Sequence, residues 1–341
     1  MLDHEIQEAL EALKQSEGNK AAAARLLDMT RSRLRRLLDK AAEQPEPDEG
    51  DELIADLPDY SQVKKRLAGY NQNYIDDFYK QRWLNLRVPH KPFLQFFIGD
   101  LHRDSPGHDD DQFEADMGLI RRAQESFTCH VVNMGDVLDN WPLGGKLGKK
   151  HHDSHLTRKE ALALVRGFMC EEGIDFTVHL LGNHDAWPGV DFETLLRQWT
   201  STPIVDWAAY ITVTTDKGFR FRTFASHDMP GSSINNPVHA LSKRAKEEGE
   251  SDLYVAAHRH KGGQGKDQNG YRGKTYNYLR VRGYKLADEY AWVKGYSEEN
   301  EGATGMAVIN PLAPMQDSIC RTFYDLEEGV DWARFLIARA A

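Results

Sequence analysis

The chain has 341 residues, of which 40% are hydrophobic and 10% aromatic, which is enough for one large domain and a smaller one. Its mean hydropathy of -0.63, the lack of any apolar run near 18 residues and the absence of a secretion-type start exclude a membrane span and predict a cytoplasmic protein. The formal charge of -10 is local, because residues 43–59 hold eight acidic side chains and no basic one, so a nucleic-acid partner is not excluded.

The first forty residues are expected to form three helices. An amphipathic pattern over 6–13, an alanine-rich segment over 21–27 and a basic segment over 31–39 are separated by short breaks, and Thr30 stands where it can cap the third helix. The third helix would have two faces. Its inward face would carry Leu34, Leu37 and Leu38, and its outward face would carry Arg31, Arg33, Arg35 and Arg36.

This succession resembles the Fis-type helix-turn-helix over roughly residues 5–39. The resemblance implies DNA binding, for which clustered arginines could neutralise phosphates. The alternative is a small helical unit that serves only to form a homodimer. The sequence leaves both readings open.

Residues 41–58 contain three prolines, a glycine and unbalanced acidic charge, as is typical of a flexible linker. A helix is expected over 59–84 and should pack on the catalytic part through an apolar face formed by Val63, Leu67, Tyr70, Tyr74 and Phe78. We therefore divide the chain into a helix-turn-helix at 1–40, a linker at 41–58 and a catalytic domain at 59–341.

From residue 93 onward, segments with strand and helix patterns alternate and then give way to consecutive strands. Strands are expected over 94–98, 130–134, 176–181, 210–214, 219–225, 253–257, 275–281 and 306–309, and helices over 113–125 and 157–172. This order predicts an α/β (α+β) fold with a mixed sheet or a β-sandwich flanked by helices.

Five short polar clusters occur in the strand-rich part, and most of them directly follow an apolar run. The clusters are Gly-Asp-Leu-His over 99–102, Gly-Asp-Val-Leu-Asp over 135–139, Gly-Asn-His-Asp over 182–185, Ser-His-Asp over 226–228 and His-Arg-His over 258–260. Asp100 and His102 are expected to point to the same side, as residues two apart do in an extended segment. Carboxylate, amide and imidazole donors suit two divalent ions, with manganese preferred and iron or zinc as alternatives.

The order and spacing of these clusters resemble the calcineurin-like metallophosphoesterase family over residues 93–309. The resemblance implies a β-sandwich that hydrolyses phosphate esters with a metal-activated hydroxide. It also implies roles for nine residues. Asp100, His102 and His260 would hold one metal, Asn183, His227 and His258 the other, Asp136 would bridge both, His184 would be the catalytic acid or would grip the phosphate, and Asp139 would orient His184.

Three further features complete this interpretation. The family usually has glycine where this chain has Ala257, which should shift the backbone slightly and leave ligation intact. The basic loop 144–152 and residues Tyr271, Arg272, Tyr276, Tyr278, Arg280, Arg282 and Tyr284 could contact a nucleic-acid strand, with ordinary solvated or strand faces as the alternative. Residues 109–111 are expected to be a charged loop near the mouth of the site.

The helix-turn-helix joined to this centre resembles phage-type members of the family and favours a phosphodiesterase or nuclease that acts on DNA. One alternative is a phosphomonoesterase or nucleotide hydrolase whose N-terminal part serves oligomerisation. The other is a DNA-binding regulator that uses the phosphoesterase core as a scaffold, against which the full set of candidate ligands argues.

Overall fold

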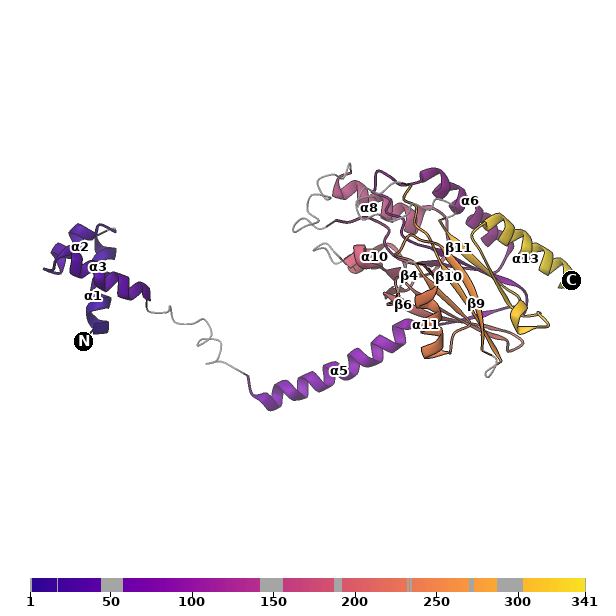
Figure 1. The fold of residues 1–341 in the computed structure, drawn as a ribbon, viewed down its shortest axis with the longest axis horizontal. Helices are drawn as coiled ribbons and strands as arrows, with labels where there is room; N and C mark the ends of the chain where they lie inside the picture. Colours follow the sequence, from indigo (N-terminus) through magenta and orange to yellow (C-terminus); the bar gives the residue numbers. More distant parts are fainter. Residues whose placement is uncertain are drawn as a thin grey trace. The chain divides into compact units, whose positions relative to one another are not determined.

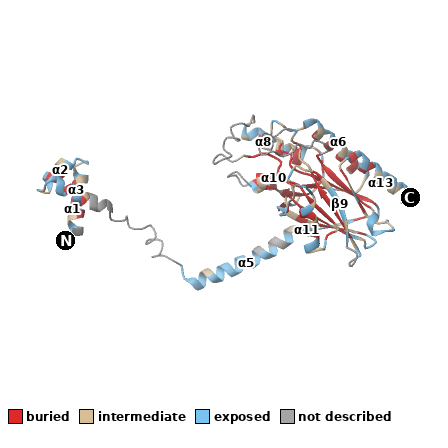
Figure 2. Cartoon of the chain, in the orientation of Figure 1, coloured by how far each residue is buried: buried red, intermediate tan, exposed pale blue. Residues whose placement is uncertain are grey.

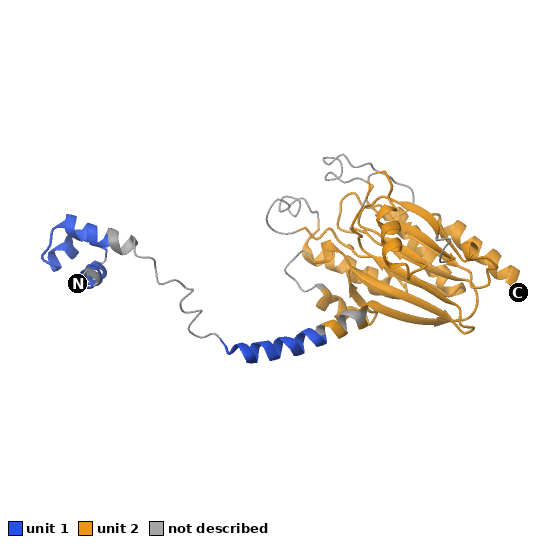
Figure 3. Ribbon diagram, turned by 60° about the horizontal axis from the view of Figure 1, so that its bottom comes forward, with its two compact units in different colours: residues 1–73 blue, residues 74–341 orange. Residues whose placement is uncertain are grey.

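The computed structural model describes residues 2–16, 18–43, 58–141, 156–186, 192–231, 233, 235–269, 273–286 and 303–340. The chain divides into two compact units, residues 1–73 and residues 74–341 (Figure 3). Among the described helices, none combines the length and the apolar character needed to cross a lipid bilayer. All three cysteines are free.

Three short helices begin the first unit: α1 (Leu2–Gln15), α2 (Lys20–Leu26) and α3 (Arg31–Glu43). Ile6, Leu34 and Leu37 are buried together in a small core, whereas the four arginines of α3 are exposed. The expected cap is confirmed, because Thr30 Oγ1 accepts a hydrogen bond from the Arg33 amide at 3.3 Å. The three-helix prediction is therefore confirmed.

The predicted linker lies mostly outside the described residues. The next helix, α5 (Tyr60–Arg82), ends earlier than expected because the chain enters strand β1 (Trp83–Val88). Leu67 and Tyr70 of the expected packing face are 53% and 66% exposed, and the side chains of Tyr74 and Phe78 are outside the described residues. The packing of this helix and the domain boundaries at residues 40 and 58 stay predictions.

The second unit contains two six-stranded mixed sheets (Figure 1). In order across the first sheet, the strands are β1, β6 (Ala208–Thr215), β7 (Arg220–Ser226), β8 (Leu253–Ala256), β10 (Lys274–Arg280) and β9 (Gly263–Asn269). Across the second they are β12 (Cys320–Phe323), β11 (Gly305–Ile309), β2 (Phe93–Ile98), β3 (Cys129–Asn133), β4 (Phe176–Leu181) and β5 (Ile204–Asp206).

Helices cover the outer faces of both sheets. The helical segments are α6 (Asp110–Ser126), α8 (Arg158–Arg166) with a π-helical turn (Gly167–Glu171), α9 (Asn183–Ala186), α10 (Phe192–Trp199), α11 (His239–Glu248), a 3₁₀ turn (Gln316–Ser318) and α13 (Leu326–Ala340). Helices α6, α8 and α13 pack on the second sheet, and α11 packs on the first. The predicted sandwich flanked by helices is confirmed.

Strand β2 shows how the layers are built. Phe93 and Phe97 enter the core between the two sheets, whereas Leu94 and Phe96 face the helices, so the strand is apolar on both sides. Figure 2 shows the buried residues concentrated along the strands. The inward Gln95 is accommodated by a 2.7 Å hydrogen bond from the hydroxyl of Thr223 on the facing sheet.

The strand directions decide where the polar clusters meet. Strands β2, β3, β4 and β5 run parallel, and in the other sheet β7 and β8 also run parallel, so the carboxyl ends within each set share an edge.

The expectation of a loop over 109–111 was wrong. Asp109 caps α6 by accepting from the Gln112 amide, and the two following aspartates form the first turn, where the helix dipole favours negative charge.

Candidate metal centre

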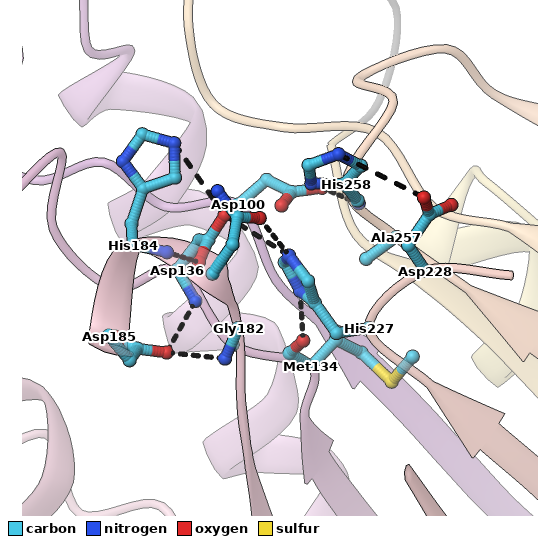
Figure 4. A network of polar contacts seen from close by, with 12 residues as sticks. Asp100, Met134, Asp136, Gly182, His184, Asp185, His227, Asp228, Ala257 and His258 are labelled. Carbon is cyan, nitrogen blue, oxygen red and sulfur yellow. Dashed lines mark hydrogen bonds and ion pairs between the residues drawn. The ribbon is translucent and has the colours of Figure 1, made fainter. Parts of the chain in front are cut away.

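All nine predicted site residues lie in the segments that follow strands β2, β3, β4, β7 and β8. Figure 4 shows how several of these side chains converge from the two sheets. The structure therefore brings together residues that are up to 160 positions apart in the sequence.

The first donor group consists of Asp100, His102 and His260, whose donor atoms all lie within 4.8 Å of one another. The Nε2 atoms of His102 and His260 face each other at 3.1 Å. Two ligands that bind one ion at about 2.1 Å and at right angles to each other would be separated by about 3 Å. Asp100 Oδ1 is buried and accepts no hydrogen bond from the part of the chain that the structure describes. A buried acceptor without a donor, next to two converging imidazoles, fits a cation.

The second donor group consists of Asp136, His227 and His258, again within 4.8 Å, and Asn183 adjoins it. His227 Nε2 lies 3.0 Å from the amide oxygen of Asn183 and 3.2 Å from Asp136 Oδ2. The other ring nitrogen of His227 donates to the Met134 carbonyl at 2.8 Å. This hydrogen bond keeps a proton on Nδ1, so Nε2 is the ring nitrogen that could bind a metal once it has lost its own proton, as is usual for metal-binding histidines.

Asp136 is held at the centre by main-chain contacts. Its Oδ1 accepts from the His184 amide at 2.9 Å. Asp185 Oδ2 accepts from the amides of Asp136 and Gly182, at 2.9 and 2.8 Å, and so ties the loop after β3 to the loop after β4. A Cβ on Gly182 would lie 2.2 Å from Asp136 Oδ1, so this position requires glycine.

Five of the candidate ligands have left-handed backbone conformations: Asp100, His102, Asp136, His258 and His260, with φ between 48° and 68°. Such values are uncommon for residues other than glycine and cluster at functional sites. We had expected Asp100 and His102 to lie in an extended segment, and this expectation was wrong. They point to one site because the chain turns sharply after β2 and donates from the His102 amide to the Asp136 carbonyl at 3.1 Å.

Burial and the charges of neighbouring residues set the pKa values of Asp100, His227 and His102. Burial, reinforced by Asp136, raises the pKa of Asp100 to about 8. Burial disfavours the charged form of His227, but the charge of Asp136 outweighs it and raises the pKa of His227 to about 9. Burial, with the charge of Lys285, lowers the pKa of His102 well below its usual range. Asp100 and His227 therefore hold protons that a bound cation could replace. His102 offers a neutral imidazole as a ligand.

His184 and Asp139 lie beside the first donor group. The Nδ1 atom of His184 contacts the main-chain carbonyl of Asp139. The carboxylate of Asp139 instead lies 2.8 Å from His102 Nδ1 and 2.6 Å from Lys285 Nζ. The first of these contacts favours the proton on Nδ1 of His102, which leaves its Nε2 free to face His260. Asp139 thus contacts both histidines, one through its main chain and the other through its side chain.

Sequence reasoning did not select several residues that support the centre. Lys285 carries a positive charge into it, and Asp185 joins two of its loops. Asp228 pairs with Arg259 at 3.0 Å and with the buried Arg280 at 3.6 Å. Asp185 and Asp228 stand in the polar clusters themselves and could have been chosen, whereas nothing near Lys285 in the sequence marks it.

Four of the seven candidate strand-binding residues are too deeply buried to line a groove. Tyr276, Tyr278, Arg280 and Tyr284 are at most 3% exposed, because the first three belong to β10 and pack under α11 or against the loop after β8. That prediction was wrong for these four. Tyr271, Arg272 and the basic loop 144–152 lie outside the described residues.

Ala257, where glycine was expected, is fully buried, and its carbonyl accepts a hydrogen bond from Arg280 Nη1 at 2.8 Å.

Comparison with known families identifies the start of the chain. Residues 6–40 match the family described as "Bacterial regulatory protein, Fis family". The N-terminal unit carries a Fis-type helix-turn-helix. The match ends at residue 40, so it says nothing of the second unit. No curated protein sequence matches the chain.

Several solved structures resemble this chain at low identity. Vacuolar protein sorting 29 from Cryptosporidium parvum is 12% identical, with a TM-score of 0.37 over 64% of this chain and 86% of the other. A 5′-nucleotidase precursor from Thermus thermophilus is 12% identical, with a TM-score of 0.38 over 73% and 59%. A predicted phosphoesterase from Streptococcus pneumoniae is 13% identical, with a TM-score of 0.27 over 68% and 97%. These distant likenesses assign neither an activity nor a ligand to this chain.

Proposed function

We propose that this protein is a metal-dependent phosphodiesterase that acts on DNA. The observation that carries the proposal is the convergence of buried and half-buried carboxylate, amide and imidazole donors from both sheets on one centre. Among the described residues, the buried Asp100 Oδ1 accepts no hydrogen bond, and leaving such an oxygen buried is costly unless it holds an ion. The Fis-type helix-turn-helix supports DNA as the partner.

The donor groups suggest where two divalent ions would bind. Asp100, His102 and His260 would hold the first ion and Asn183, His227 and His258 the second, with Asp136 between them. Imidazoles and oxygen donors without cysteine suit manganese, iron or zinc, and we take manganese as the first choice. When bound, such ions would polarise the phosphoryl oxygens and lower the pKa of a coordinated water.

The protein residues have separate tasks in this proposal. His184 would donate a proton to the leaving oxygen from Nε2, which lies 3.9 Å from Asp136 Oδ2. The contact of its Nδ1 with the Asp139 carbonyl fixes the ring so that Nε2 faces the centre. Lys285 would neutralise Asp139 and keep this carboxylate against His102. Each role depends on a contact between described residues.

Metal-loaded protein tests the proposal with two model substrates. We expect manganese-dependent hydrolysis of bis-p-nitrophenyl phosphate to exceed that of p-nitrophenyl phosphate. His184→Ala should reduce this turnover by roughly 10²–10⁴-fold and still bind metal in elemental analysis. His239→Ala, an exposed histidine of the same unit, is the matched control and should change neither.

The opposite substrate preference would contradict the diesterase proposal and favour a phosphomonoesterase or nucleotide hydrolase. If no divalent metal supports turnover, the result would favour the other alternative, a DNA-binding protein that uses a phosphoesterase-like core as a scaffold. Removing residues 1–45 separates the roles of the two units. This truncation should leave model-substrate turnover unchanged and weaken DNA binding, whereas unchanged affinity across a salt series would refute the proposed role of the helix-turn-helix.

A further inference from the structure

Trp207 is the single residue between β5 and β6, where the chain passes from one sheet to the other. Its φ of 64° lies in the left-handed region, and the residue is 39% exposed. A bulky aromatic side chain is an outlier in this conformation, for which glycine has no steric penalty. The sharp crossing between sheets accounts for the backbone conformation, but it does not account for a tryptophan.

The backbone of Trp207 is fixed to the candidate metal centre. Its carbonyl accepts a 2.8 Å hydrogen bond from the amide of His227. Its indole lies edge-on to the His227 imidazole, with ring centroids 5.2 Å apart and an interplanar angle of 74°. His227 Nε2 in turn lies 3.2 Å from Asp136 Oδ2. One imidazole therefore separates an exposed indole from the proposed reaction site.

This arrangement suits a substrate that carries a flat aromatic group close to its phosphate. Indoles stack on nucleobases with little preference among them, because every base has a π-face. A phosphate bound at the centre would bring an adjoining base within reach of the ring that borders His227. A role in substrate binding would account for a tryptophan at a position whose backbone conformation disfavours it.

We propose that Trp207 is a specificity-determining residue that stacks on an unpaired nucleobase next to the scissile phosphate. The inference rests on the proposed phosphodiesterase function and narrows its substrate to single-stranded or frayed nucleic acid. A base inside a duplex is covered by its neighbours, so its face becomes accessible only when it leaves the stack. Duplex ends and unpaired strands would therefore be preferred over continuous duplex.

Two diesters with the same scissile bond and leaving group test this proposal. Thymidine 5′-(p-nitrophenyl phosphate) carries a base, whereas methyl p-nitrophenyl phosphate does not. In the metal-loaded full-length protein, Trp207→Ala should reduce kcat/KM for the thymidine substrate roughly tenfold to hundredfold, the loss expected for one base stack. The same variant should leave the methyl substrate within about twofold, and Trp207→Phe should retain most of the thymidine activity.

Two further variants separate stacking from a structural role. Trp207→Gly removes the steric penalty together with the indole, so it should lose the thymidine preference without a fall in Tm. Phe335→Ala removes an exposed aromatic of α13 and should leave the preference unchanged. Equal losses on both substrates, or a Tm that falls in step with activity, would show that Trp207 acts only on the fold.

A binding measurement gives a readout that does not depend on turnover. Thymidine 5′-monophosphate should quench the tryptophan fluorescence of the wild-type protein, and Trp207→Phe should lose most of that quenching. If the wild type hydrolyses neither diester but still shows this difference, the phosphodiesterase proposal fails and the base-stacking role stands. If the quenching is the same in both proteins, the stacking role is wrong whatever the activity.

Discussion

The Nε2 atom of His227 lies 3.2 Å from Oδ2 of Asp136, although the two residues follow strands of different sheets. Asp136 raises the pKa of His227 against the effect of burial, and His227 lowers the pKa of Asp136 although burial opposes its ionisation. The pair thus forms a buried ionic contact between the two sheets. A divalent cation bound here would displace the proton that now links them.

Asp136→Ala is expected to remove both metal ions. The carboxylate belongs to the second donor group, contacts His227 and lies 3.9 Å from His184 beside the first, so in the proposed arrangement its loss removes the anionic ligand that both ions would share. Elemental analysis after gel filtration should give well under one ion per chain. Asp175→Ala, an exposed aspartate of the same unit, should retain the wild-type content. Two ions retained in Asp136→Ala would refute the bridging role.

Gly182→Ala should disrupt the centre without a large effect on the core. The new Cβ would lie 2.2 Å from Asp136 Oδ1 and 2.6 Å from His227 Cε1, so at least one of these side chains has to move. We expect metal affinity, measured by titration calorimetry, to fall at least tenfold, as is typical when the ligand environment is disturbed. In Gly167→Ala no described residue has an atom within 4 Å of the new Cβ, so this variant should bind metal normally. Equal affinities in the two variants would contradict the packing argument.

His179 is expected to make the second unit less stable in acid. Burial lowers its pKa to about 3, so the folded chain keeps this imidazole neutral while the unfolded chain takes up a proton near 6.5. This contribution to stability is complete above pH 6.5 and is lost as the pH falls toward 3, by about 1.4 kcal/mol per pH unit.

Urea unfolding at pH 7 and pH 4.5 checks this expectation. His179→Gln should show a smaller difference in the free energy of unfolding between the two pH values than the wild type. His4→Gln, on the exposed face of α1, should behave like the wild type. The same acid loss in all three proteins would show that His179 does not contribute to it.

Arg36→Ala should weaken DNA binding through loss of a phosphate contact. The residue is exposed on α3, on the side away from Leu34 and Leu37. In a salt titration, the slope of log K against log salt should fall by about one unit. Lys14→Ala, on α1, serves as the control for a general loss of positive charge. Identical slopes for the wild type and Arg36→Ala would exclude this arginine from the interface.

Local patterns in the sequence predicted much of the secondary structure. The apolar run of β4 was predicted at its observed bounds, and so was the cap that Thr30 provides for α3. These features depend on neighbouring residues, whose periodicity and hydrogen-bonding capacity are visible in the sequence. Strand β1 was missed because Trp83 and Leu84 continue the apolar spacing of the preceding helix, and only pairing with β6 makes the segment a strand.

The sequence by itself also determined which donors follow which strands, and hence that imidazoles and carboxylates would gather at the shared edge of parallel strands. Only the tertiary structure decided how they are aimed: the left-handed backbone at Asp100 and His102, the contact of the Asp139 carboxylate with His102, and the entry of Lys285. Strand periodicity is a property of nearest neighbours. The direction of a side chain beyond the strand end depends on contacts with segments more than a hundred residues away, which no local pattern records.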